Sequence, residues 1–147
     1  MTAKRPPATV VAFDFGTRRI GVAVGNTLTR TARALTTIAR ERADDRFAAI
    51  AALLTEWQPG LLVVGMPVHA DGALHAMTAR AQRFARQLQG RFGLPVELAD
   101  ERWTTQAAQQ ALAGAGAGGR RARAARDQVA AQIILQGWFD DHAAADS

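Results

Sequence analysis

The 147-residue sequence contains no cysteine, which excludes a disulfide framework, a thiolate zinc site and a thiol nucleophile. It also has no apolar run approaching the ~20 residues that a membrane-spanning helix needs. The N-terminal segment MTAKRPPATVV carries basic residues but leads into two prolines, unlike the long apolar core of a secretory signal. These absences predict a soluble, cytoplasmic protein that does not act at a membrane.

Acidic residues are the minority among charged groups, with 13 Asp and Glu against 18 Lys and Arg and a formal net charge of +5. Small basic domains often bind polyanions, and arginine suits bidentate contact with phosphate. A GC-rich genome would also raise the arginine and alanine content. The charge balance is therefore consistent with a nucleic-acid partner without proving one.

The chain length fits a single domain, which would bury roughly two-thirds of the surface that the unfolded chain exposes. Apolar periodicity and Gly or Pro breaks predict the element order β-β-β-α-β-α-β-α-α. The strands are expected at Thr9–Phe15, Ile20–Gly25, Arg33–Ala39, Leu61–Gly65 and Val96–Ala99. The helices are expected from a cap at Asp44 or Asp45 to about Trp57, from about Leu74 to Phe92, from a cap at Thr104 or Thr105 to Ala113, and from about Arg123 to Phe139. Helical spacing predicts a buried apolar stripe on each of the first two, made of Phe47, Ile50, Leu54 and Trp57 and of Met77, Ala81, Phe84 and Leu88. This order predicts an α/β domain over residues 9–140, with a partly parallel sheet, helices on both faces and disordered tails at 1–8 and 141–147.

Three acidic residues occupy positions where a charged group is costly. Asp14 lies inside the apolar stretch TVVAFDF, Glu101 directly follows the strand PVELAD, and Asp127 borders the apolar stripe of the last helix. A shared divalent cation would offset the cost of burying these carboxylates, and Mg²⁺ prefers oxygen ligands. Ligand sites of α/β sheets lie at the carboxyl ends of parallel strands, where Asp14 and Glu101 would meet if their strands are neighbours.

Each of these acids also has an ordinary structural explanation. Asp14 would serve as a hydrogen-bonded turn residue before Gly16, and Glu101 would pair with a surface arginine such as Arg102. Asp127 would stabilise the N-terminal part of its helix through the helix dipole. Spacing alone therefore leaves both a metal site and these separate roles open.

Four blocks of the sequence resemble the YqgF/RuvX family, in the same order: FDFGTRRIGVAVGN, VVGMPVHADG, LADERWTTQAA and RDQVAAQIILQGWFD. The resemblance spans about residues 9–140, and its specificity comes from the four blocks together. It implies an RNase H-like fold, a five-stranded mixed β-sheet flanked by α-helices. It also implies a metal-dependent nuclease, a phosphodiester hydrolase that processes the 5′ end of precursor 16S rRNA in ribosome biogenesis.

Position by position, the resemblance implies that Asp14, Glu101 and Asp127 are the catalytic residues and the ligands of Mg²⁺ or Mn²⁺. Two such ions about 4 Å apart would activate a water and stabilise the leaving oxygen. Nearby arginines are expected to bind the phosphates of the substrate, namely Arg18, Arg102, Arg123 and Arg126.

Three functions stay open at the level of the sequence. The first is processing of precursor rRNA, with a pre-ribosomal particle as a further partner. The second is resolution of four-way DNA (Holliday) junctions, which would require a two-fold homodimer because a junction needs paired cuts. The third is a non-catalytic nucleic-acid-binding protein. A monomer and a homodimer are both compatible with the sequence.

Two other motifs are set aside. The stretch Gly114–Gly119 matches G-x-G-x-x-G, but a dinucleotide site needs this motif between a strand and a helix, and here it follows a predicted helix. The stretch after Asp14 also matches the phosphate loop of actin-like ATPases. That fold needs two such domains, and hence well over twice this length.

Overall fold

The computed structural model describes residues 9–16, 18–66, 75–100 and 119–146. Its elements are β1 (Thr9–Asp14), β2 (Ile20–Asn26), β3 (Thr31–Ile38), α1 (Ala43–Trp57), β4 (Leu61–Met66), α2 (His75–Phe92), β5 (Val96–Asp100) and α4 (Arg120–Asp146). The strands form one sheet in the order β3-β2-β1-β4-β5. β2 pairs antiparallel with β1 and β3, whereas β4 pairs parallel with β1 and β5. The predicted mixed sheet is confirmed, and the helix predicted to end at Ala113 lies outside the described residues.

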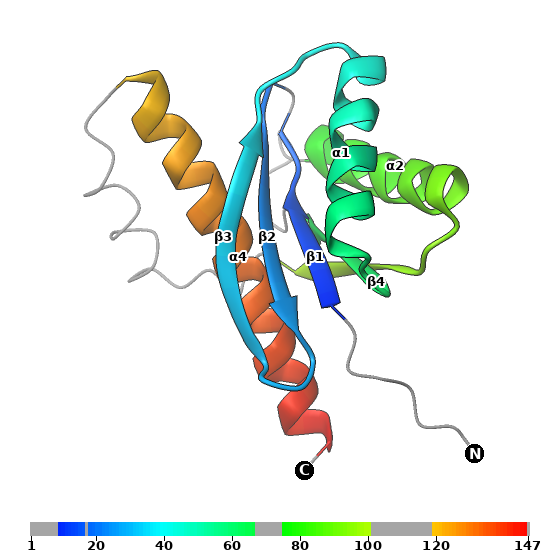
Figure 1. Cartoon of the computed structure of the whole chain (residues 1–147), viewed down its shortest axis with the longest axis vertical. Coiled ribbons are helices and arrows are strands. Elements are labelled where there is room, and N and C mark those ends of the chain that lie inside the picture. The colour runs from blue at the N-terminus through cyan, green and yellow to red at the C-terminus, as the bar shows by residue number, and fades with distance from the viewer. Residues whose placement is uncertain (1–8, 17, 67–74, 101–118, 147) are drawn as a thin grey trace.

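The sheet separates two apolar cores (Figure 1). Helices α1 and α2 cover one face, and α4 crosses the other face behind β2 and β3. Alternation along β1 decides which side chain enters which core: Val11 and Phe13 face α1 and α2, whereas Val10 and Ala12 face α4. The prediction of helices on both faces is therefore confirmed.

The apolar stripes predicted for α1 and α2 are the faces that these helices bury. Phe47, Ile50 and Leu54 of α1 and Ala81, Phe84 and Leu88 of α2 are all buried. The expected helix cap at Asp44 or Asp45 is wrong. The residue before the helix is Arg42, which makes no side-chain cap hydrogen bond, and the two aspartates lie in the first turn, where they complement the helix dipole.

Helix α4 is longer than the sequence predicted at both ends. It begins at Arg120 and continues to Asp146, so the segment expected to be a disordered tail from residue 141 is helical through Asp146. Two features favour the longer C-terminal end. The ring of His142 lies 3.9 Å from the ring of Trp138, one helical turn earlier. Three alanines follow, and alanine has the highest helix propensity of all residues. Among the described residues, no helix is long and apolar enough to cross a membrane.

Side chains of α4 cover the backbone of the edge strand β3. Gln136 accepts a hydrogen bond from the Ala32 amide at 3.0 Å and donates one to the Arg30 carbonyl at 3.0 Å. Gln132 donates to the Ala32 carbonyl at 3.1 Å. Unpaired backbone groups on an edge strand can form hydrogen bonds with another chain. The two glutamines bind the N–H and C=O groups of Ala32, and in doing so they also hold α4 against the sheet.

Candidate catalytic site

The parallel strands β1, β4 and β5 end at the same edge of the sheet. Asp14, the last residue of β1, is in register with Gly65 of β4, and Met66 is in register with Asp100 of β5. The carboxyl edge of parallel strands is where α/β sheets bind ligands. Asp14 thus lies at the edge that the sequence predicted for the site.

Asp14 points to the α4 face of the sheet, because it follows Val10 and Ala12 in the alternation along β1. Its neighbours on that face are Gly21 of β2 and Gly65 of β4, the residues paired with it on either side. Neither neighbour has a side chain. The half-buried carboxylate of Asp14 therefore has no side chain on either paired neighbour, and the backbone of another element can approach the sheet here.

Asp127 reaches the same place from α4. A Cβ atom on Gly21 would overlap the backbone carbonyl of Asp127, so glycine is what allows α4 to approach β2 this closely. The Asp14 and Gly21 backbones are directly paired. Gly21 therefore brings the two predicted catalytic aspartates together, one on the neighbouring strand and one on the helix above.

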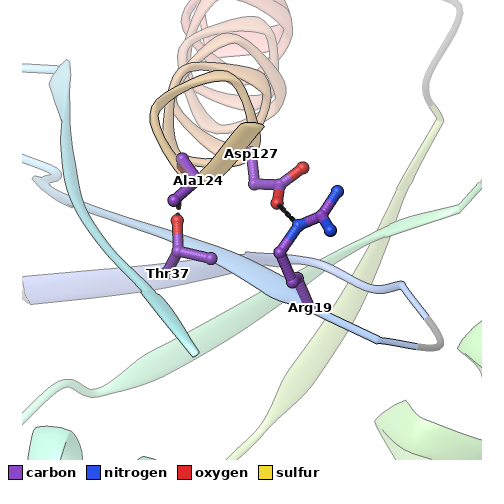
Figure 2. Close-up of polar contacts among 4 residues, drawn as sticks. All are labelled: Arg19, Thr37, Ala124 and Asp127. Atoms are coloured by element: carbon purple, nitrogen blue, oxygen red, sulfur yellow. Dashed lines mark hydrogen bonds and ion pairs between the residues drawn. The ribbon is translucent and has the colours of Figure 1, made fainter. Parts of the chain in front are cut away.

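Two polar contacts hold this turn of α4 on the sheet (Figure 2). The Nε atom of Arg19, just before β2, donates to Oδ2 of Asp127 at 2.5 Å, and the two side chains are 31% and 25% exposed. The hydroxyl of Thr37 on β3 donates to the Ala124 carbonyl at 2.6 Å. The ion pair orients the Asp127 carboxylate, and the hydroxyl fixes the backbone one turn earlier.

The third predicted acid, Glu101, and the predicted phosphate ligand Arg102 lie outside the described residues. Glu101 follows Asp100, the last residue of β5, directly in the sequence. Among the described residues, no three Asp, Glu or His side chains form a cluster that could hold a metal ion. Asp14 and Asp127 are two carboxylates, and Mg²⁺ usually binds through one or two carboxylates together with substrate phosphates. Asp14 and Asp127 therefore fit a Mg²⁺ ion whose other ligands include substrate phosphates.

The N-terminal turns of α4 carry positive charge only. Arginines occupy positions 120, 121, 123 and 126, and the first acid of the helix is Asp127. Of the predicted phosphate ligands, Arg123 and Arg18 are exposed and Arg126 is half-buried. Cations at a helix N-terminus oppose the helix dipole, whereas an anion there is favoured by both the dipole and the arginines. This end of α4 is suited to bind a polyanion.

Reasoning from the sequence did not identify Arg19 as the partner of Asp127. The partner of Arg19 is 108 residues away, so no local pattern connects the two. The position of Gly21 in the block FDFGTRRIGVAVGN was the available signal for a close approach, but it did not identify the approaching element.

Comparison with known proteins identifies the family. The sequence profile of the RuvX family, described as Holliday junction resolvase, matches residues 8–141. A protein of Chromobacterium violaceum named "Putative pre-16S rRNA nuclease" is 56% identical over 131 residues, covering 88% of this chain and 96% of that protein. A Nitrosomonas eutropha protein of the same name is 55% identical over 137 residues, covering 93% of this chain and 87% of that protein.

The fold is also found among solved structures. T. thermophilus RuvC in complex with a Holliday junction substrate superposes with a TM-score of 0.56 at 19% identity, covering 93% of this chain and 96% of that chain. This likeness shows the RNase H-like fold that the sequence predicted. Because the RuvX profile spans nearly the whole chain and curated relatives are more than half identical to it, this chain belongs to the RuvX family.

Proposed function

We propose that this protein is a metal-dependent nuclease that hydrolyses phosphodiester bonds in the 5′ leader of precursor 16S rRNA. The observation that carries the proposal is that Gly21 pairs with Asp14 in the sheet and packs against the backbone of Asp127, at the carboxyl edge of the parallel strands. The names of the relatives that are more than half identical to the chain supply the choice of rRNA.

Asp14, Asp127 and Glu101 would hold Mg²⁺ or Mn²⁺. A bound divalent cation would supply Lewis-acid activation of water and neutralise charge at the scissile phosphate. Arg19 keeps the Asp127 carboxylate oriented by its 2.5 Å contact. Gly21, paired with Asp14 in the sheet, lets the Asp127 turn of α4 approach the strand that carries the other carboxylate.

The arginines of the site hold the substrate strand in this proposal. Arg123 and Arg126 lie on the first turns of α4, close to Asp127, and Arg18 precedes the Arg19 that contacts this acid. Arg102, adjacent to Glu101 in the sequence, is assigned the same role. Contacts of this kind bind phosphates without reading bases, so binding should weaken steeply as salt increases.

A cleavage assay on two substrates tests the proposal. An RNA carrying the 16S 5′ leader and a four-way DNA junction are incubated with Mg²⁺, Mn²⁺ or EDTA. We expect the RNA to be cut only when the metal is present. Asp14→Asn keeps the size of the side chain and should lower the rate by more than the 10–100-fold that is usual for loss of a group supporting a metal ligand.

Asp141→Asn is the matched control, since Asp141 is exposed near the opposite end of α4. It should cut at the wild-type rate. Symmetric cutting of the junction in place of the RNA would make the protein a resolvase, the activity given in the family description. Binding of both substrates without any cutting would instead support a non-catalytic role.

A further inference from the structure

A cavity of about 280 Å³ lies between α1 and α2, at the same edge of the sheet as Asp14. Phe15, which directly follows Asp14, forms part of its wall together with Phe47 and Phe84. The Phe15 and Phe84 rings lie 4.9 Å apart and the Phe47 and Phe84 rings 6.0 Å apart. Because Phe13 and Phe15 alternate with Asp14, this cavity is on the opposite face of the sheet from the catalytic carboxylates.

One side of the cavity is strongly basic. Arg80 and Arg83 of α2 line it and are both exposed. Neither forms a salt bridge with any residue that the structure describes. The sequence has no acid between Asp71 and Glu97, so the whole of α2 carries no compensating negative charge. These two cations lie beside an open cavity without an anion on their own helix.

A third arginine lies deeper in the cavity. Arg46 of α1 is only 7% exposed, its Nε atom donates to the Arg40 carbonyl at 2.5 Å, and its guanidinium is 5.7 Å from the centre of the Phe15 ring. Burial lowers the pKa of Arg46, and Glu41 at the rim opposes that shift. Three arginines and one acid, Glu41, therefore line the cavity, and its net charge is positive.

We propose that this cavity binds a phosphate of the substrate strand, with Arg80 and Arg83 as its ligands. The inference rests on the proposed nuclease function and extends it to the face of the sheet opposite α4. Phosphate is the anion that a nuclease substrate presents at regular intervals, and paired guanidinium groups suit its geometry. A substrate strand crossing the edge at Asp14 would then be held on both faces of the sheet.

A second copy of this chain is a poorer occupant. In a two-fold contact the same surface meets itself, so the arginines of one α2 would face those of the other. α2 has no acids to relieve that repulsion.

Binding of leader RNA measured against salt concentration tests the inference. Asp14→Asn in EDTA serves as the parent protein, so that the RNA is not cut during the measurement. Adding Arg80→Gln and Arg83→Gln should weaken binding about tenfold. The slope of log K against log salt should fall by about 0.7, the contribution of one phosphate of a single strand, because the two arginines hold the same phosphate.

Arg86→Gln is the matched control. Arg86 is exposed on the same helix and carries the same charge, but it does not line the cavity. It should leave the affinity within about twofold of the parent and the slope unchanged. The urea midpoints of all variants should agree, because the substituted side chains are exposed.

The two proposals fail in different ways. A double variant that binds RNA with the affinity and slope of the parent, while the protein with Asp14 intact still cuts RNA, overturns the cavity assignment alone. If the double variant changes its oligomeric state by light scattering and its RNA affinity is unaffected, the assignment is also overturned. The cavity is then part of an interface between two copies of the chain. A parent protein that does not bind RNA overturns the proposed function and, with it, this inference.

Discussion

Replacement of Gly21 by alanine tests whether the close approach of α4 to β2 builds the site. A Cβ atom at position 21 would overlap the carbonyl group of Asp127 and lie 3.2 Å from its Cα atom. All of these are backbone atoms, so no side-chain rotation relieves the overlap. β2 and α4 must separate by on the order of 1 Å, and such a gap forfeits about a quarter to a half of the dispersion attraction across it.

We expect Gly21→Ala to lower the free energy of unfolding by about 1–3 kcal/mol, the usual cost of overpacking. In a chain of this size each kcal/mol lowers the melting temperature by about 2–4 °C. Urea unfolding followed by circular dichroism gives the free energy directly. RNA cleavage should fall as well, including at temperatures where the variant is fully folded, because the displacement moves Asp127 away from Asp14.

Gly90→Ala provides the control for this substitution. Gly90 lies inside α2 and is exposed, and no atom lies within 4 Å of an added Cβ. Alanine at this position should raise the stability by about 0.5–1 kcal/mol, because glycine is a poor helix former, and should leave cleavage unchanged. A Gly21→Ala protein as stable and as active as the wild type would refute the packing argument.

Two further substitutions probe the contacts of α4. Arg19→Gln removes the ion pair with Asp127, and since both side chains are partly exposed, the free energy of unfolding should change by less than about 1 kcal/mol. The Mg²⁺ concentration that half-saturates cleavage should rise about tenfold or more, because the Asp127 carboxylate loses the partner that orients it; an unchanged Mg²⁺ titration would contradict this role. Gln136→Ala removes two hydrogen bonds to the edge strand and should cost about 1–2 kcal/mol. It should also increase self-association, measured by light scattering, because the β3 edge is uncovered.

Most of the fold could be predicted from the sequence because buried apolar residues recur at the spacing of a strand or a helix. The runs TVVAFD and LLVVG are apolar on both faces, as expected of strands covered by helices on each side. The stripe through Phe84 and Leu88 gave the buried face of α2 correctly. The C-terminal extent of α4 was underestimated, because Asp140 and Asp141 are exposed and the contact of His142 with Trp138 is local, and hydrophobic patterning detects neither.

The candidate site was only partly predictable, for a different reason. Asp14 and Asp127 were conspicuous because each carboxylate interrupts an apolar pattern. Their proximity depends on the register of β1 with β2 and on the packing of α4 against Gly21. These are long-range properties that no window of sequence contains. The ion pair between Arg19 and Asp127 is of the same kind.

The charges of α4 oppose its own dipole along its whole length. The first turns carry arginines and no acid, while the last twenty residues carry aspartates and no lysine or arginine. Each misplaced charge costs a surface helix about 0.3–1 kcal/mol. The helix tolerates this because one face is buried in the core, through Ala131, Ile134, Leu135, Trp138 and Phe139.

A loss of helix stability of this kind is expected where charged residues bind a ligand and do not stabilise the fold. Arg121→Glu tests this, since Arg121 is exposed on the first turn of α4. The substitution should stabilise the fold by about 0.5–1 kcal/mol, because an acid at a helix N-terminus complements the dipole. It should at the same time weaken RNA binding and reduce its salt dependence, because an anion replaces a cation at the end of α4 that is proposed to face the substrate. If RNA binding is lost but the free energy of unfolding in urea does not rise, the arginines do not destabilise α4 through the helix dipole. A gain in stability with unchanged binding would mean that this end of α4 does not contact the substrate.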